Sequence, residues 1–115
     1  MNKNILVITN DSIEKLVFSV FLSDYNILYL KEFNQLVNYN NINFKFIIIN
    51  CDIELISPEF KTWLLMYKRE NKTYIIYISS SIILDNTLIM DFDSVIYKPY
   101  EISEIISLIE NNNLV

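Results

Sequence analysis

Residues 44–52 of the chain read FKFIIINCD, the most strand-like stretch in the sequence. Its apolar run is broken only by Lys45 and does not alternate with polar residues, a pattern typical of a strand covered on both faces. Asn50, Cys51 and Asp52 then end the run. Strands of this kind lie inside parallel sheets with a helix layer on either side, so the stretch predicts an α/β fold.

Apolar runs of similar character occur before and after this stretch, and a helical pattern follows each of them. Besides 44–49, the expected strands cover residues 4–9, 26–30, 74–78 and 94–97. The expected helices cover residues 11–23, 32–38, 57–69, 82–90 and 101–110. Strands that alternate with helices through short connections predict a parallel sheet. We therefore expect one domain over residues 1–115, a doubly wound five-stranded parallel sheet in a three-layer α/β/α arrangement.

Three of the expected helices carry apolar residues at helical spacing. Asp11 with Glu14 forms an approximate capping box at the start of the first helix, and Ser57 followed by Pro58 is a strong start for the third. The predicted apolar faces are Ile13, Leu16, Val17, Val20 and Phe21 in the first helix, Phe60, Trp63, Leu64 and Tyr67 in the third, and Ile102, Ile105, Ile106 and Ile109 in the last.

The composition excludes several classes of function. The chain has no glycine, no histidine, a single cysteine and a net charge of −5. Without glycine neither a P-loop nor a dinucleotide-binding fingerprint can form, and no CxxC or histidine cluster exists to hold zinc. The acidic balance argues against nucleic acid as a partner, and no apolar run reaches the roughly 20 residues that cross a membrane. We expect a cytoplasmic protein.

The absence of glycine also moves left-handed turn positions to residues that carry a Cβ. That conformation costs such a residue roughly 1–2 kcal/mol, and asparagine tolerates it best. We therefore expect these turns at Asn26, Asn40, Asn41, Asn71 and Asn86.

Three features at the expected strand ends carry a resemblance to a known family. Tyr97-Lys98-Pro99-Tyr100 follows the short fifth strand, Ser79 closes the fourth strand, and Asn50 closes the third. In this arrangement the chain resembles a response-regulator receiver domain of the CheY-like type over essentially its whole length. The resemblance implies two-component signalling, a cis bond before Pro99, and a functional site beyond the carboxyl ends of the strands.

The positions that carry the chemistry of receivers are occupied differently in this chain. In the family two adjacent acids hold Mg²⁺ and an aspartate accepts the phosphoryl group, whereas the matching positions hold Thr9, Asn10 and Asn50. An amide oxygen is a poor nucleophile, and Mg²⁺ is normally held by carboxylates. The aromatic switch position of the family falls on Val95. We therefore expect no catalytic role, no cofactor, no Mg²⁺ binding, and a degenerate phosphoacceptor pocket formed by Thr9, Asn10, Asn50, Asp52, Ser79 and Lys98.

Two residues leave other interpretations open. Asp52 could replace the missing aspartate and make the domain a weakly phosphorylatable receiver with a displaced acidic site. Cys51 could be the nucleophile of a small enzyme, although no histidine is present to activate its thiol. Lys98 is expected to be a structural remnant held by Asn50, by Asp52 or by carbonyl groups at the strand ends.

An excess of apolar residues after the fourth strand indicates a surface for a protein partner. A helix over 82–90 is too short to bury all of its apolar residues, and exposed apolar patches commonly mark partner surfaces. By resemblance, receivers use the face of helix four, strand five and helix five for dimers and effectors. An isoleucine-rich surface without a partner would have the same composition. We expect phosphorylation-independent contact with a protein partner or a second copy through Ile83, Leu84, Leu88, Met90, Tyr97 and Tyr100.

Overall fold

The computed structural model describes residues 2–39, 41–51, 56–80 and 92–112. At its centre is a sheet of five parallel strands in the order β2-β1-β3-β4-β5. This is the sheet that the sequence predicted, with strand bounds that agree to within about two residues. The strands are β1 (Asn4–Ile8), β2 (Asn26–Leu30), β3 (Phe46–Asn50), β4 (Tyr74–Ser79) and β5 (Ser94–Tyr97).

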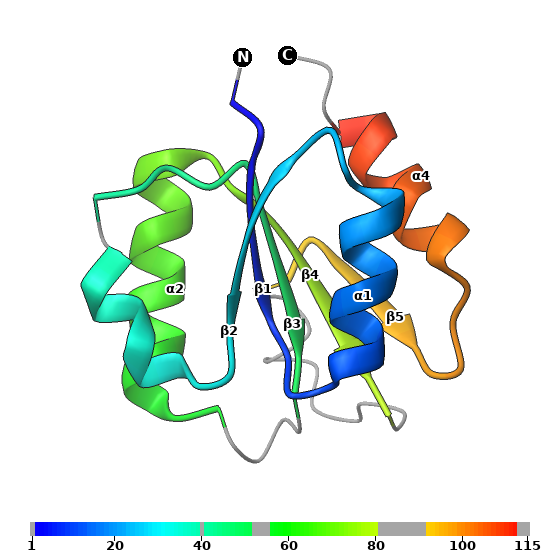
Figure 1. Cartoon of the computed structure of the whole chain (residues 1–115). Helices are drawn as coiled ribbons and strands as arrows, with labels where there is room; N and C mark the ends of the chain where they lie inside the picture. Colours follow the sequence, from blue (N-terminus) through cyan, green and yellow to red (C-terminus); the bar gives the residue numbers. More distant parts are fainter. Residues whose placement is uncertain (1, 40, 52–55, 81–91, 113–115) are drawn as a thin grey trace.

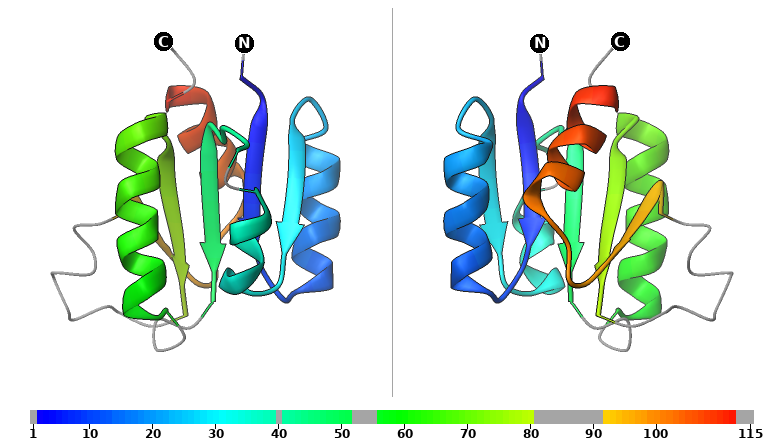
Figure 2. Two further views of the ribbon diagram at one scale, coloured as in Figure 1. Left: turned by 90° about the vertical axis from the view of Figure 1, so that its left-hand side faces the viewer. Right: turned by 90° about the vertical axis from the view of Figure 1, so that its right-hand side faces the viewer.

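Helices cover both faces of the sheet (Figures 1 and 2). One face carries α1 (Ser12–Phe21) and α4 (Ile102–Asn112), and the other carries α2 (Pro58–Asn71) and the short 3-10 helix η1 (Phe33–Tyr39). The predicted three-layer arrangement is thus confirmed. The helix expected over residues 82–90 lies outside the described residues. Within the described part of the chain, no helix is long and apolar enough to span a membrane.

Strand β3 is the middle strand of the sheet, and every one of its residues is buried. Phe46 and Ile48 point into the core on the side of α1 and α4. Ile47 and Ile49 point into the core on the side of α2 and η1. Full burial of an apolar side chain of this size stabilises a fold by roughly 1.5–3 kcal/mol. The unbroken apolar run of this strand is therefore required by the helices on both of its faces.

Helix α2 begins and packs as predicted. Ser57 is its N-cap and accepts a hydrogen bond from Phe60 N at 3.1 Å, and Pro58 is its first residue. The ring of Phe60 stacks on Phe33 with centroids 3.9 Å apart, which joins η1 to this helix. The predicted apolar stripe faces the core, fully or partly buried: Phe60, Trp63, Leu64 and Tyr67.

The predicted inward face of α1 is wrong. Glu14 and Phe18 take the inward positions, and Val17 is half-buried. Asp11 is the N-cap before the first helical residue, and Glu14 is held inward by hydrogen bonds that it accepts from Asn50 of β3. These two anchors set the rotation of the helix about its axis. The other residues of the predicted face are between 56% and 72% exposed: Ile13, Leu16, Val20 and Phe21.

The apolar stripe of α4 is partly confirmed. Ile105 and Ile109 have no exposed surface, whereas Ile102 and Ile106 are half-buried. The helix starts where Glu104 Oε2 accepts a hydrogen bond from Glu101 N at 2.8 Å. One side of this stripe therefore remains open at the surface.

Among the residues that the structure describes, Lys72 has a positive φ, of 53°, and it caps the end of α2. The sequence predicted Asn71 for this role. The side chain of Asn71 instead donates to the carbonyl of the residue four positions earlier at 3.0 Å, which keeps it in the last helical turn. Of the other predicted positions, Asn26 and Asn41 have no positive φ, and Asn40 and Asn86 lie outside the described residues.

The packing of α2 predicts the effect of Tyr67→Phe. The hydroxyl of Tyr67 donates to Ile42 O at 2.6 Å and accepts from Phe44 N at 2.7 Å. Without it both backbone groups lose a partner, so the free energy of unfolding should fall by about 1–3 kcal/mol in urea, followed by Trp63 fluorescence. The exposed Tyr97→Phe is the control and should change it by less than about 0.5 kcal/mol. Equal effects of the two variants would contradict the role given to Tyr67.

Candidate functional site

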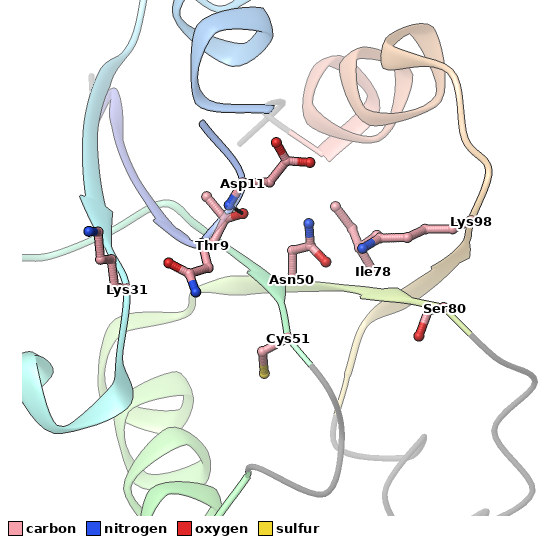
Figure 3. Close-up of a pocket in the computed structure, with 9 residues that line it drawn as sticks. Thr9, Asp11, Lys31, Asn50, Cys51, Ile78, Ser80 and Lys98 are labelled. Atoms are coloured by element: carbon pink, nitrogen blue, oxygen red, sulfur yellow. Dashed lines mark hydrogen bonds between the residues drawn. The ribbon is translucent and has the colours of Figure 1, made fainter. Parts of the chain in front are cut away.

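The carboxyl ends of the strands meet at one edge of the sheet, where a cavity of about 410 Å³ opens. We call it the strand-end cavity. In Figure 3, Lys98 reaches across it from the end of β5 toward Asn50 at the end of β3. Of the predicted pocket residues, Thr9, Asn10, Asn50 and Lys98 line it. The remaining lining residues are Asp11, Lys31, Cys51, Ile78 and Ser80.

After β1, the side chains of Thr9 and Asp11 accept hydrogen bonds from nearby backbone N–H groups. Thr9 is buried, and its Oγ1 accepts a hydrogen bond from Asp11 N at 3.1 Å. The carboxylate of Asp11 accepts from Ile13 N at 2.9 Å and from Glu14 N at 3.3 Å. Asp11 is therefore the N-cap of α1, as the sequence predicted. The acid nearest to the family's metal position is already engaged in capping.

Asn50 bonds to Glu14 and not to Lys98. Its Nδ2 donates to Glu14 Oε1 at 2.8 Å and to Oε2 at 2.7 Å, and both side chains are buried. In Figure 3 the side-chain nitrogen of Asn50 points toward α1. Hydrogen bonds to a charged acceptor are about twice as strong as those between neutral groups. The amide at the end of β3 is thus held in one orientation.

Tyr100 closes this network from the other side. Its hydroxyl donates to Glu14 Oε2 at 2.6 Å. Burial raises the pKa of Tyr100 well above its ordinary value, and the hydrogen bond and charge of Glu14 and the charge of Asp11 raise it further. We refer to Glu14, Asn50 and Tyr100 as the Glu14 network. It joins α1, β3 and the segment before α4.

Glu14 is a site residue that the sequence did not predict. Its spacing from Asp11 is that of a capping box, in which the glutamate turns back to the N-cap backbone. Here Asp11 N bonds to Thr9 instead, and Glu14 turns inward. The available signal was the position of Glu14 one turn before Phe18, because both then share a helix face.

The segment after β5 follows the resemblance in its backbone. The peptide bond between Lys98 and Pro99 is cis, and Lys98 N donates to Ser79 O at 2.8 Å. Within the described part of the chain, Lys98 Nζ makes no hydrogen bond or ion pair, so the expected bond to Asn50 is not formed. Ser79 is buried at the end of β4, and its neighbour Ser80 lines the cavity in its place.

The predicted switch residue, the cysteine and the expected partner face each lie in a different environment. Val95 is half-buried against the core under α2. Cys51 is half-buried in the wall of the cavity. Of the expected partner face, Tyr97 is exposed, whereas Tyr100 is half-buried and turned to Glu14. Asp52, Ile83, Leu84, Leu88 and Met90 lie outside the described residues.

The charge of the strand-end cavity differs from that of a cation site. Its charged lining residues in the described ranges are Asp11, Lys31 and Lys98. Among the described residues no group of three or more His, Cys, Asp or Glu side chains could hold a metal ion. Hard cations such as Mg²⁺ take oxygen ligands, usually with one or two carboxylates. The described lining offers hydroxyl and amide groups and a single carboxylate.

The Glu14 network predicts the effect of Asn50→Asp. The introduced carboxyl would lie within about 3 Å of the carboxylate of Glu14, and two like charges at that distance raise the pKa of the pair. The stability that a carboxyl with a pKa raised by folding contributes is complete below its unfolded pKa and is lost as pH rises through its folded pKa. The penalty of the variant should therefore grow as pH rises from about 4 to 7. Urea denaturation at neutral pH should show a loss of at least about 2 kcal/mol.

The double variant Asn50→Asp with Glu14→Gln is the matched control. The glutamine amide can donate to the introduced carboxylate while its oxygen accepts from Tyr100, so complementarity is restored. We expect it to recover at least half of the lost stability. A double variant no more stable than Asn50→Asp alone would contradict the network.

The raised pKa of Tyr100 predicts that the free energy of unfolding falls at alkaline pH. Because its pKa is raised by folding, its phenol stabilises the native state below the unfolded pKa of about 10 and loses that contribution as pH rises further. Between pH about 9 and 11, the free energy of unfolding of the wild type should fall more steeply than that of Tyr100→Phe. Tyr97→Phe should follow the wild type. Identical slopes for all three proteins would contradict this assignment.

Comparison with known proteins places the fold. No family model and no curated protein matches the sequence. The receiver domain of the sensor histidine kinase PA1611 from Pseudomonas aeruginosa is similar with a TM-score of 0.75, 13% identity and coverage of 96% of this chain and 97% of that one. The chemotaxis protein CheY4 of Vibrio cholerae gives a TM-score of 0.73, 11% identity and coverage of 96% and 98%. A CheY-like receiver domain protein from Methanospirillum hungatei gives a TM-score of 0.70 and 19% identity, with coverage of 96% of this chain and 93% of that one. The chain therefore has the CheY-like fold of response-regulator receiver domains.

Proposed function

We propose that this chain is a receiver-like signalling module that is not phosphorylated and acts by protein–protein contact. The observation that carries the proposal is the amide of Asn50, which stands where receivers have the phosphoacceptor aspartate and donates to Glu14 at 2.7 and 2.8 Å. Fold similarity to receivers supports a place in two-component signalling.

The chemistry at position 50 opposes phosphoryl transfer. In receivers the phosphoryl group joins a carboxylate oxygen and forms an acyl phosphate. An amide would have to lose its nitrogen to give the same product, and its oxygen is a weak nucleophile. In Asn50 the nitrogen is in addition engaged by a buried carboxylate, so the group cannot turn freely. Asn50 therefore offers no carboxylate nucleophile, and its side chain is not free to change orientation.

The surroundings also oppose a metal-assisted reaction. The PA1611 receiver domain holds a magnesium ion in its active-site cleft. In the strand-end cavity Thr9 and Asn10 stand at the positions of the family's metal-binding acids, and Asp11 caps α1. Lys98 and Lys31 add positive charge. We therefore propose that the domain works without Mg²⁺ and without catalysis.

A signal through this domain would then depend on a fixed surface. A ligand shifts a conformational equilibrium only by its different affinity for the two states, and no change of covalent charge is available here. Val95, at the position of the family's aromatic switch, is packed on a core. The Glu14 network further joins three elements around the cavity. Tyr97 is the described, exposed residue of the face that we expect to meet a partner.

Treatment with acetyl phosphate and Mg²⁺ followed by intact-mass measurement tests the proposal. We expect an unchanged mass, whereas a receiver domain with its acids intact, treated in parallel, gains one phosphoryl group. Gain of one group that is lost on Asp52→Asn would overturn the proposal in favour of a weakly phosphorylatable receiver. Gain that survives Asp52→Asn but is lost on Cys51→Ser would overturn it in favour of a thiol nucleophile.

A further inference from the structure

A second cavity, of about 380 Å³, opens between η1 and α2, on the face of the sheet opposite α1 and α4 (Figure 1). Among the described residues it shares no lining residue with the strand-end cavity. Its apolar lining consists of Phe33, Leu36, Phe60 and Trp63. We call this cavity the η1/α2 pocket. Its volume lies in the range of roughly 300–1,000 Å³ that is usual for small-molecule sites.

Three nearly parallel aromatic rings line the η1/α2 pocket. Phe33 and Phe60 stack with centroids 3.9 Å apart and planes 27° apart, and the ring of Trp63 lies 5.9 Å from Phe60 at 18°. Phe60 is buried, whereas Phe33 and Trp63 are half-buried and keep part of their surface accessible. Another flat ring can stack on rings that are arranged in this way. The pocket therefore favours a planar aromatic ligand.

The polar lining of the η1/α2 pocket has unused hydrogen-bonding capacity. Glu59 is exposed in the first turn of α2, and Asn34 is exposed in η1. Within the described part of the chain, neither side chain makes a hydrogen bond or an ion pair. Ser57, by contrast, already accepts a hydrogen bond from Phe60 N as the N-cap of α2. Glu59 and Asn34 are therefore the groups available to orient a ligand.

Glu59 sets the charge of the η1/α2 pocket, because it is the one charged residue in the described lining. A carboxylate attracts a cation and repels an anion, and a cation is further stabilised over the face of a tryptophan ring. The charged lining of the strand-end cavity is different, with Lys31 and Lys98 beside Asp11. The η1/α2 pocket is thus suited to a positively charged ligand.

We infer that the η1/α2 pocket binds a small planar aromatic cation, a ring that bears a protonated amine or amidine group. The ring stacks against the aromatic lining. The positive group donates to the carboxylate of Glu59, and the side-chain carbonyl of Asn34 accepts a further N–H. This inference goes beyond the proposed function and does not depend on it, because no residue of the Glu14 network lines this pocket.

Benzamidine is the probe, and benzamide and benzoate are neutral and negative analogues of nearly the same shape. Trp63 is the single tryptophan of the chain, so its fluorescence reports on the pocket directly. We expect benzamidine to change this fluorescence with a Kd on the order of 1 mM or lower, and to shift backbone amide resonances of η1 and the first turns of α2 in NMR. Benzamide and benzoate should bind at least about fivefold more weakly.

Glu59→Gln tests the charge with Glu70→Gln as its control, an exposed acid of the same helix that does not line the pocket. Glu59→Gln should weaken binding of benzamidine at least about fivefold and change binding of benzamide less than about twofold. Glu70→Gln should change neither by more than about twofold. Phe33→Leu removes one ring of the stack and should weaken binding of both molecules, whereas Phe21→Leu, exposed on α1, should weaken neither.

Circular dichroism checks that each variant is folded. The two glutamate variants leave the stacked rings in place, so their comparison decides the inference even where Phe33→Leu unfolds. Absence of benzamidine binding, amide shifts that map to the strand-end cavity, or benzoate binding as tightly as benzamidine would overturn the inference. Equal effects of Glu59→Gln and Glu70→Gln would overturn it as well, because the cation would then not be held by Glu59.

Discussion

The carboxylate of Glu14 is the interaction on which the arrangement of the strand-end cavity depends. A buried carboxylate is costly unless hydrogen bonds compensate for lost water. Asn50 from β3 and Tyr100 from the segment before α4 supply them at 2.6 to 2.8 Å. Glu14 also lies in the first turn of α1, where the helix dipole favours negative charge. Neutral donors and a helix start therefore hold this acid without a lysine.

The same interaction has two structural consequences. It holds the side-chain amide of Asn50 at the end of β3 in one orientation. It also goes with an orientation of α1 in which Glu14 and Phe18 face the sheet while Ile13, Leu16, Val20 and Phe21 are exposed. The fixed amide of Asn50 and the exposed apolar residues of α1 are thus both linked to the inward position of Glu14.

The sequence predicted the sheet well because β3 and its neighbours are buried on both faces, and such strands appear as unbroken apolar runs. Ser57, Pro58 and Asp11 predicted helix starts because caps act within a few residues. The face of α1 was not predictable from periodicity, since an exposed and a buried apolar stripe have the same spacing. The Glu14 network joins residues 36 and 86 positions apart, and no local pattern indicates such contacts.

The side-chain amide of Asn50 reports most directly on the central claim. Its NH₂ resonances can be followed by NMR while Mg²⁺ and beryllofluoride are added to the protein. The account predicts that they stay in place, because Glu14 holds the nitrogen and the cavity takes up neither reagent. Saturable shifts of this NH₂ group, together with shifts at Thr9 and Lys98, would contradict it.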